Sequence, residues 1–217
     1  MGTYANVAKV KVSLPKQLPS RLTTLQKACT AATFAQNPEG CPKASEVGHA
    51  KVITPLLPVP LEGPAYFVSH GGEAFPDLTI VLKGKDPYPI TVHLVGSTQI
   101  KNGVTTSTFK ATPDTPFSSF ELTLPQGKTS ALAANANLCA SKLTMPTEFT
   151  AQNGAVLAQN TPIKVLGCKP PSRHEKLLKA LAACHKKHNH AKRKACERAA
   201  RKRFGPKKKA KKAKRKR

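Results

Sequence analysis

The sequence is poor in acidic residues, in aromatic residues and in long apolar stretches. It has 11 Asp and Glu against 36 Lys and Arg, no Trp, and only 5% aromatic residues. No stretch of about 18 apolar residues occurs, so no transmembrane helix is predicted. Residues 1–8 also lack the apolar run of a signal peptide.

Sequence motifs of hydrolytic enzymes are missing too. Residues 69–73, Ser-His-Gly-Gly-Glu, are similar to the His-Gly-Gly oxyanion loop of esterases, but the Gly-x-Ser-x-Gly nucleophile motif is absent. We therefore interpret this segment as a turn between strands. Asp77, Asp86 and Asp114 are scattered, without the spacing of a glycosidase pair or a metal loop. We predict no catalytic residues, no cofactor and no enzymatic activity. A hydrolase whose site leaves no motif stays open as an alternative.

The six cysteines follow one another as three local pairs: Cys29 and Cys41, Cys139 and Cys168, Cys184 and Cys196. An even number at short separations favours disulfides and an oxidising compartment. Of the 15 possible connectivities we predict nearest-neighbour pairing. The alternative is six reduced, buried cysteines in a cytosolic protein. Because no export signal is visible, we expect the chain to be the C-terminal portion of a longer exported protein, or its start to be misplaced.

Residues 1–168 have the pattern of a mainly β domain, for which we predict an antiparallel β-sandwich. Alternation in 7–14 indicates a half-buried strand. Asn102-Gly103 and Asn153-Gly154 are typical of hairpin turns. Helical spacing of Leu22, Leu25 and Cys29 predicts one short helix over 20–34. The further predicted strands are 47–54, 64–69, 77–83, 89–97, 104–111, 117–124, 141–150 and 155–166.

Composition changes abruptly after Cys168. Residues 169–217 hold 22 of the 36 basic residues but only 2 of the 11 acidic ones. Ser172 and Glu175 have the spacing of a capping box. On one continuous helix Cys184 and Cys196 would lie about 18 Å apart and could not bond. Folding the chain at 188–190 brings them together, so 169–206 is predicted to be a basic αα-hairpin.

The hairpin also contains potential metal ligands, His185, His188 and His190, beside its two cysteines. Their spacing matches no zinc-finger pattern and there is no Cys-x-x-Cys knuckle. Histidines are also common in polar turns, so we predict no metal site.

Residues 207–217 are predicted to be a disordered polycationic tail, because they contain no side chain able to join a core. The tail is expected to bind polyanions by counterion release, without sequence preference, since it has no aromatic platform. A merely solubilising tail is the alternative. The predicted polyanion-binding residues are Lys207, Lys208, Lys209, Lys211, Lys212, Lys214, Arg215, Lys216 and Arg217.

Most of the chain resembles a known kind of protein. LPKQLPSRLTTLQKACTAATFAQNPEGCP, GPAYFVSHGGEAFPDLTIVL and PFSSFELTLPQG are similar to a domain of large exported proteins of soil actinobacteria. ALAACHKKHNHAKRKACERAARKRFGP resembles a C-terminal module of such proteins. The resemblance implies export and a cell-envelope or extracellular setting, and it brings no catalytic residues.

These observations predict a non-catalytic exported protein whose basic C-terminal region binds anionic polymers. The expected partners are anionic wall polymers or an anionic lipid surface, and no small-molecule substrate is identified. The alternative is an intracellular nucleic-acid-binding protein with a tail like that of a linker histone. The cysteines distinguish the two, because only the first is expected to contain disulfides.

Overall fold

The computed structural model describes residues 5–170 and 172–205. The chain divides into two compact units, with the boundary between residues 165 and 166. The first is a β-sheet unit and the second is a pair of helices, α3 (Arg173–His185) and α4 (His190–Phe204). No described helix is both long enough and apolar enough to cross a membrane.

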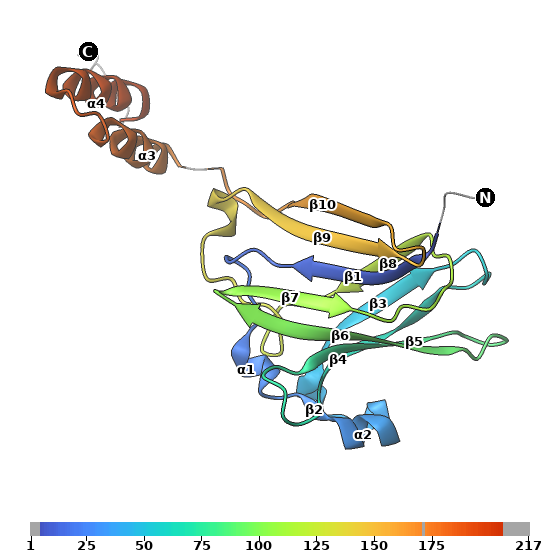
Figure 1. The fold of residues 1–217 in the computed structure, drawn as a ribbon. Helices are drawn as coiled ribbons and strands as arrows, with labels where there is room; N and C mark the ends of the chain where they lie inside the picture. The colour runs from blue at the N-terminus through green and yellow to red at the C-terminus, as the bar shows by residue number, and fades with distance from the viewer. Residues whose placement is uncertain (1–4, 171, 206–217) are drawn as a thin grey trace, which may run out of the picture. The chain divides into compact units, whose positions relative to one another are not determined.

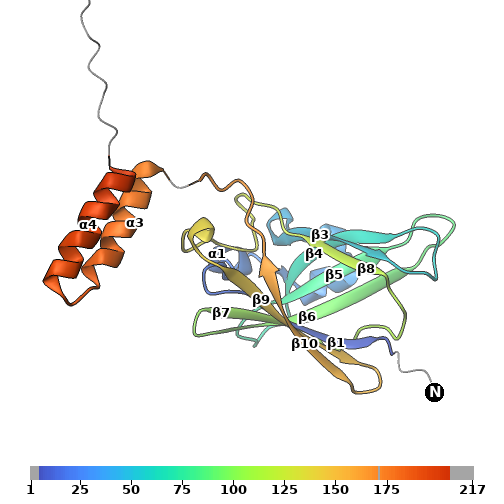
Figure 2. The same ribbon diagram turned by 90° about the horizontal axis from the view of Figure 1, so that it is seen from above.

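The first unit is one strongly curled, mainly antiparallel sheet (Figures 1 and 2). Its strands follow the order β10-β9-β1-β7-β6-β5-β4-β3-β8, and β2 pairs in parallel with β4. The strand bounds are β1 (Val7–Ser13), β2 (Cys29–Thr30), β3 (Glu46–Ile53), β4 (Leu61–Ser69), β5 (Asp77–Lys83), β6 (Thr91–Lys101), β7 (Val104–Phe109), β8 (Ser119–Thr123), β9 (Leu143–Ala151) and β10 (Val156–Ile163).

All the described strands belong to this one sheet, whereas the predicted sandwich requires two. The long strand β6 is the reason. Residues 91–96 of β6 pair with β5, and residues 96–101 pair with β7, so a single strand joins the two halves. Gly96 stands at this change of partner, where an added Cβ would lie 2.6 Å from the Phe109 ring. The chain therefore curls one sheet instead of stacking two.

The two Asn-Gly segments form the turns that the sequence predicts. Asn102 and Gly103 connect β6 to β7 with φ angles of 53° and 76°. Gly154 has φ of 83° between β9 and β10. Positive φ is tolerated by glycine and, among other residues, best by asparagine. These local turns set the register of both hairpins.

The centre of the sheet is buried on both faces. Ile80 and Phe67 belong to the larger apolar cluster, whereas Val81 and Tyr66 belong to a second cluster with Cys29 and Phe34. Successive residues of a strand point to opposite faces of the sheet, so the adjacent residues Ile80 and Val81 place the two clusters on opposite faces. The Phe34 and Tyr66 rings meet edge to face, 5.8 Å apart. The segment that carries Phe34 therefore covers one face of β4 and β5.

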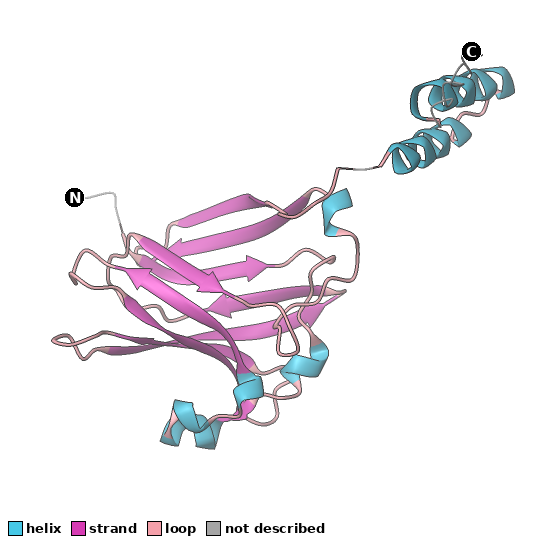
Figure 3. Cartoon of the chain, turned by 180° about the vertical axis from the view of Figure 1, so that it is seen from behind, coloured by secondary structure: helices cyan, strands magenta, loops and turns pink. Residues whose placement is uncertain are grey.

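The continuous helix predicted over 20–34 is wrong. The segment forms α1 (Leu22–Leu25), then β2, then α2 (Ala31–Gln36) (Figure 3). Cys29 and Thr30 are extended and pair with Val68 and Ser69 of β4. Tertiary pairing thus overrides the local helical spacing. The remaining helical segments are the 3-10 turns η1 (Pro38–Gly40), η2 (Lys43–Ser45) and η3 (Leu138–Ala140).

Candidate functional site

The helical pair of the second unit is the candidate site, and side-chain caps determine where each helix begins. The Ser172 hydroxyl accepts a hydrogen bond from the Glu175 backbone N–H, and the Glu175 carboxylate accepts one from the Ser172 N–H at 2.7 Å. Asn189 caps α4 by accepting from the Lys192 N–H at 3.0 Å. The predicted capping box is confirmed. Hydrogen bonding to the Ser172 backbone N–H, and then to the Ser172 side chain, holds the pKa of Glu175 below its ordinary value.

A disulfide between Cys184 and Cys196 closes the pair into a hairpin, with the two Cα atoms 5.6 Å apart. Cys184 and Ala200 are buried at the seam. At the other end of the hairpin the Arg173 Nε donates to the Gly205 carbonyl at 2.7 Å. The two helices are thus joined at both ends of a narrow seam.

The hairpin surface is dominated by cations. Residues 172–205 contain 12 Lys and Arg but only Glu175 and Glu197 as acids. Glu175 serves the helix cap, and Glu197 lies 3.5 Å from the His185 Nε2 and 3.9 Å from the Arg193 Nε. Every one of the 12 cationic residues is solvent-exposed except the half-buried Arg193. The acids therefore serve the hairpin itself and leave an exposed positive surface.

The sequence-predicted polyanion-binding residues, Lys207 to Arg217, lie outside the described residues. The cations of α3 and α4 were not among them, although the cysteine spacing and capping box that order these helices were visible in the sequence. The described residues contain no group of three or more His, Cys, Asp or Glu placed to hold a metal ion. Both hairpin cysteines are consumed by their disulfide.

The sheet unit is disulfide-bonded as well. Cys29 and Cys41 are joined, with Cα atoms 5.4 Å apart, which fixes β2 to the loop after α2. Cys139 of the sheet unit and Cys168, which follows the unit boundary, are both in the disulfide-bonded state. No described cysteine is free. The two bonds whose geometry is described, Cys29–Cys41 and Cys184–Cys196, join the pairs that sequence order predicts.

The loop after β4 contains the Ser-His-Gly-Gly-Glu segment and is held by its own side chains. The Ser69 hydroxyl donates to the Glu73 carboxylate at 2.6 Å, and the His70 backbone N–H donates to the same oxygen at 2.9 Å. The Ser69 hydrogen bond lowers the pKa of Glu73. His70 lies 3.5 Å from Asp77, whose pKa burial raises. The Ser69 hydroxyl is thus hydrogen-bonded to a carboxylate of the same loop, an arrangement that stabilises a turn.

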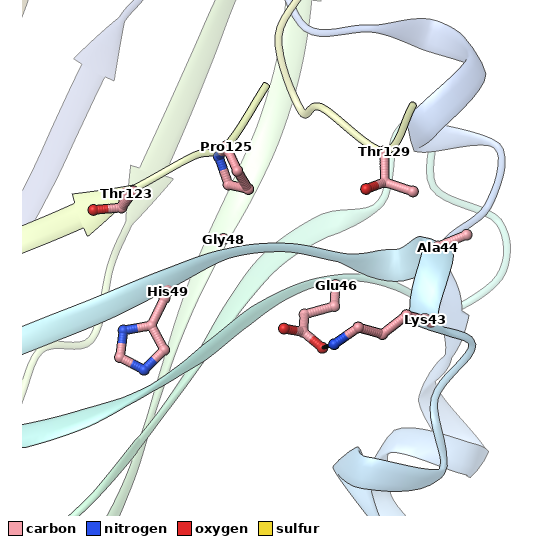
Figure 4. Close-up of a pocket in the computed structure, with 8 residues that line it drawn as sticks. All are labelled: Lys43, Ala44, Glu46, Gly48, His49, Thr123, Pro125 and Thr129. Carbon is pink, nitrogen blue, oxygen red and sulfur yellow. Dashed lines mark hydrogen bonds and ion pairs between the residues drawn. The ribbon is translucent and has the colours of Figure 1, made fainter. Parts of the chain in front are cut away.

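A pocket of about 370 Å³ lies beside β3 and β8 (Figure 4). Its charged pair, Lys43 and Glu46, point at one another with Nζ and Oε2 2.5 Å apart, and this contact raises the pKa of Lys43. Gly48 forms part of the wall, where a Cβ would lie 2.6 Å from the Thr123 carbonyl oxygen. Since its opposite charges neutralise each other, we assign this pocket no ligand. The lining residues are Lys43, Ala44, Glu46, Gly48, His49, Thr123, Pro125 and Thr129.

Comparison with known proteins adds no relative to this description. No protein-family model matches the chain. No curated protein and no solved structure matches it either.

Proposed function

We propose that the protein is an exported, non-catalytic protein of the cell envelope or extracellular space, whose basic C-terminal region binds anionic polymers. One observation carries the proposal. The disulfide-closed hairpin exposes its cations while both of its acidic side chains are engaged in the cap and in contacts with His185 and Arg193. Such a surface attracts polyanions by charge, and the polymer's released counterions supply the driving force.

The oxidised cysteines support the setting outside the cell. All six cysteines are disulfide-bonded, and disulfides persist in oxidising compartments, whereas cytosolic thiols are kept reduced. An anionic wall polymer or anionic lipid surface is the partner that fits this setting.

The hairpin composition supports binding without sequence preference. Phe204 is the only aromatic residue in 169–217, so bases find almost no stacking platform. Contacts from the 12 Lys and Arg of residues 172–205 to phosphates would position a polymer by charge and carry no sequence information. Affinity should therefore depend on charge density and on salt.

Deleting residues 207–217 from the full chain tests the proposal, because this segment carries nine of the basic residues. We expect weaker binding to heparin, teichoic acid and nucleic acid, with an unchanged melting temperature of the sheet unit. Log affinity should fall with log salt by about 0.7–0.9 per phosphate contacted. Salt-insensitive binding, or strong preference for one nucleic-acid sequence, would place recognition on the sheet unit instead.

The alternative function is that of an intracellular nucleic-acid-binding protein, favoured by the same basic composition. Counting free thiols in protein isolated from its native host separates the two proposals. We expect none without reductant and six with it. Six free thiols before reduction would favour the intracellular alternative.

A further inference from the structure

The contact between His185 and Glu197 identifies one flank of the hairpin. Both side chains lie on the same side of the seam that Cys184 and Cys196 close. Successive residues of an α-helix are about 100° apart, so the residues that share this flank follow from periodicity. On α4 they are Lys194 and Arg201, with Arg198 at the outer edge.

The opposite flank is different in charge. Periodicity places on it Lys176 and Lys179 from α3, and Lys192, Lys202 and Arg203 from α4. We name these five residues the cation face, and all five are exposed. Neither glutamate lies on it, because Glu175 turns back to the cap and Glu197 contacts His185. The cation face is therefore the acid-free side of the hairpin.

Small side chains separate the charges on this face. Ala183 of α3 and Ala195 and Ala199 of α4 lie on the same flank. Lys192 and Arg203 are 11 residues apart on α4, about 17 Å along the helix axis. Because the two helices run antiparallel, four of the five cations lie toward the end where Arg173 meets Gly205, and Lys192 alone lies near the turn. A linear polyanion can contact both ends of this elongated face at once, whereas a compact anion can contact only one.

We infer that the cation face binds a linear phosphodiester polymer that carries no bases. This inference rests on the proposed function, and it adds the surface and the chemical class of the ligand. Four of the five residues are lysines, which bind phosphate as point charges, whereas arginine is the usual reader of planar groups. Phe204 is the one aromatic residue of 172–205, and the Arg203 guanidinium already lies over its ring, 5.2 Å from the centroid, which leaves that face of the ring covered and not open to a base. The disulfides place the partner in an oxidising compartment.

Two charge-matched triple variants of the full chain test the face. One is K176Q/K192Q/R203Q on the cation face, and the other is K194Q/R198Q/R201Q on the opposite side. Each removes three positive charges, and glutamine is a good helix former. The probes are poly(glycerol phosphate) and a single-stranded DNA of equal charge. We expect the first variant to lower the log–log salt slope for poly(glycerol phosphate) by about 2–3, and the second by less than 1.

Lysine acetylation with mass spectrometry gives a residue-level readout on the unaltered protein. Saturating poly(glycerol phosphate) should slow acetylation of Lys176, Lys179, Lys192 and Lys202 severalfold. Lys194, on the other flank of the same helix, is the internal control and should react at an unchanged rate. This measurement decides the question even if the cation-face variant loses helical structure.

The remaining outcomes separate the inference from the function on which it rests. Equal loss of salt slope in both variants, with uniform lysine protection, would overturn the cation face and leave polyanion binding standing. Tighter binding of single-stranded DNA than of poly(glycerol phosphate) would overturn the base-free ligand. No salt-dependent binding of either probe by the unaltered chain would overturn both the inference and the proposed function.

Discussion

The sheet unit and the helical hairpin are held together by different means. In the sheet, apolar clusters cover both faces of β4 and β5, and Ile80 and Val47 are fully buried. In the hairpin, Cys184 and Ala200 are the buried apolar residues that the structure describes. A core distributes stability over many side chains, whereas the hairpin concentrates it in a crosslink and two caps. Loss of a disulfide should therefore only lower the stability of the sheet but unfold the hairpin.

Removing core volume should have the largest effect, and only on the sheet. Ile80→Ala leaves a cavity at a site with 0% exposure, at the centre of the larger cluster. We expect a loss of about 2–5 kcal/mol in the free energy of unfolding of the sheet unit. Chemical denaturation followed by far-UV circular dichroism measures it.

Val156→Ala is the control for this substitution. Val156 is 63% exposed on β10, so truncating this β-branched side chain to alanine should change the free energy of unfolding by less than about 0.5 kcal/mol. Equal effects at both positions would mean that the sheet does not depend on its buried centre.

The two described disulfides provide a matched pair, because each closes a loop with a sequence separation of 12. Chain entropy predicts that each contributes about 3 kcal/mol. C184A/C196A should abolish the hairpin's helical signal, since isolated helices of 13 and 15 residues are marginal in water. C29A/C41A should only lower the sheet's melting temperature. Circular dichroism of both double variants makes the comparison.

The comparison fails if C184A/C196A keeps full helicity. That result would mean that packing along the seam, and not the crosslink, holds the two helices together.

Loss of the cap should have a smaller effect. Ser172→Ala removes the acceptor for the Glu175 backbone N–H at the start of α3, which should cost about 1 kcal/mol. The hairpin's thermal transition should move down while the sheet's does not. Ser172→Thr, which keeps the hydroxyl, should restore most of the loss. An unchanged transition in Ser172→Ala would contradict a role for the cap.

The smallest expected effect is a pH dependence of the hairpin alone. The Ser172 backbone N–H and side chain, with His174 nearby, lower the folded-state pKa of Glu175 relative to its ordinary 4.5. A depressed carboxyl pKa stabilises the folded state above the ordinary value, and this contribution is lost as pH falls through the lowered pKa. Helicity should therefore decline below about pH 4.5, and E175Q should flatten this decline. A decline of equal size in E175Q would assign it to other groups.

Much of the fold follows from local pattern, because alternation and turn residues act over a few positions. The residues of β5 and both Asn-Gly turns coincide with the segments that the sequence predicts. Sheet order does not follow in the same way. β1 pairs with β7 and with β9, partners about 100 or more residues away, and no local signal encodes this choice. For the same reason the local pattern predicts helix at Cys29 and Thr30, which form β2 only by pairing with β4.

The features of the candidate site are likewise only partly predictable from the sequence. The capping box and the Cys184–Cys196 pair were predicted, since both depend on spacing along one hairpin. The flank that lacks acids was not predicted. It depends on which side of the seam Glu197 occupies, and the His185 contact that shows this is tertiary. Charge counts alone favoured the tail over the helices.

The hydrogen bond from Arg173 to the Gly205 carbonyl makes the hairpin suitable for insertion into another protein. It holds the first residues of the hairpin next to the last, so the chain enters and leaves at one end. Packed helices lie about 8–10 Å apart, and exposed loop tips are the sites where an inserted domain is best tolerated. Residues 172–205, with their own crosslink, thus form a cassette that a surface loop of an unrelated host protein should accept without stretching.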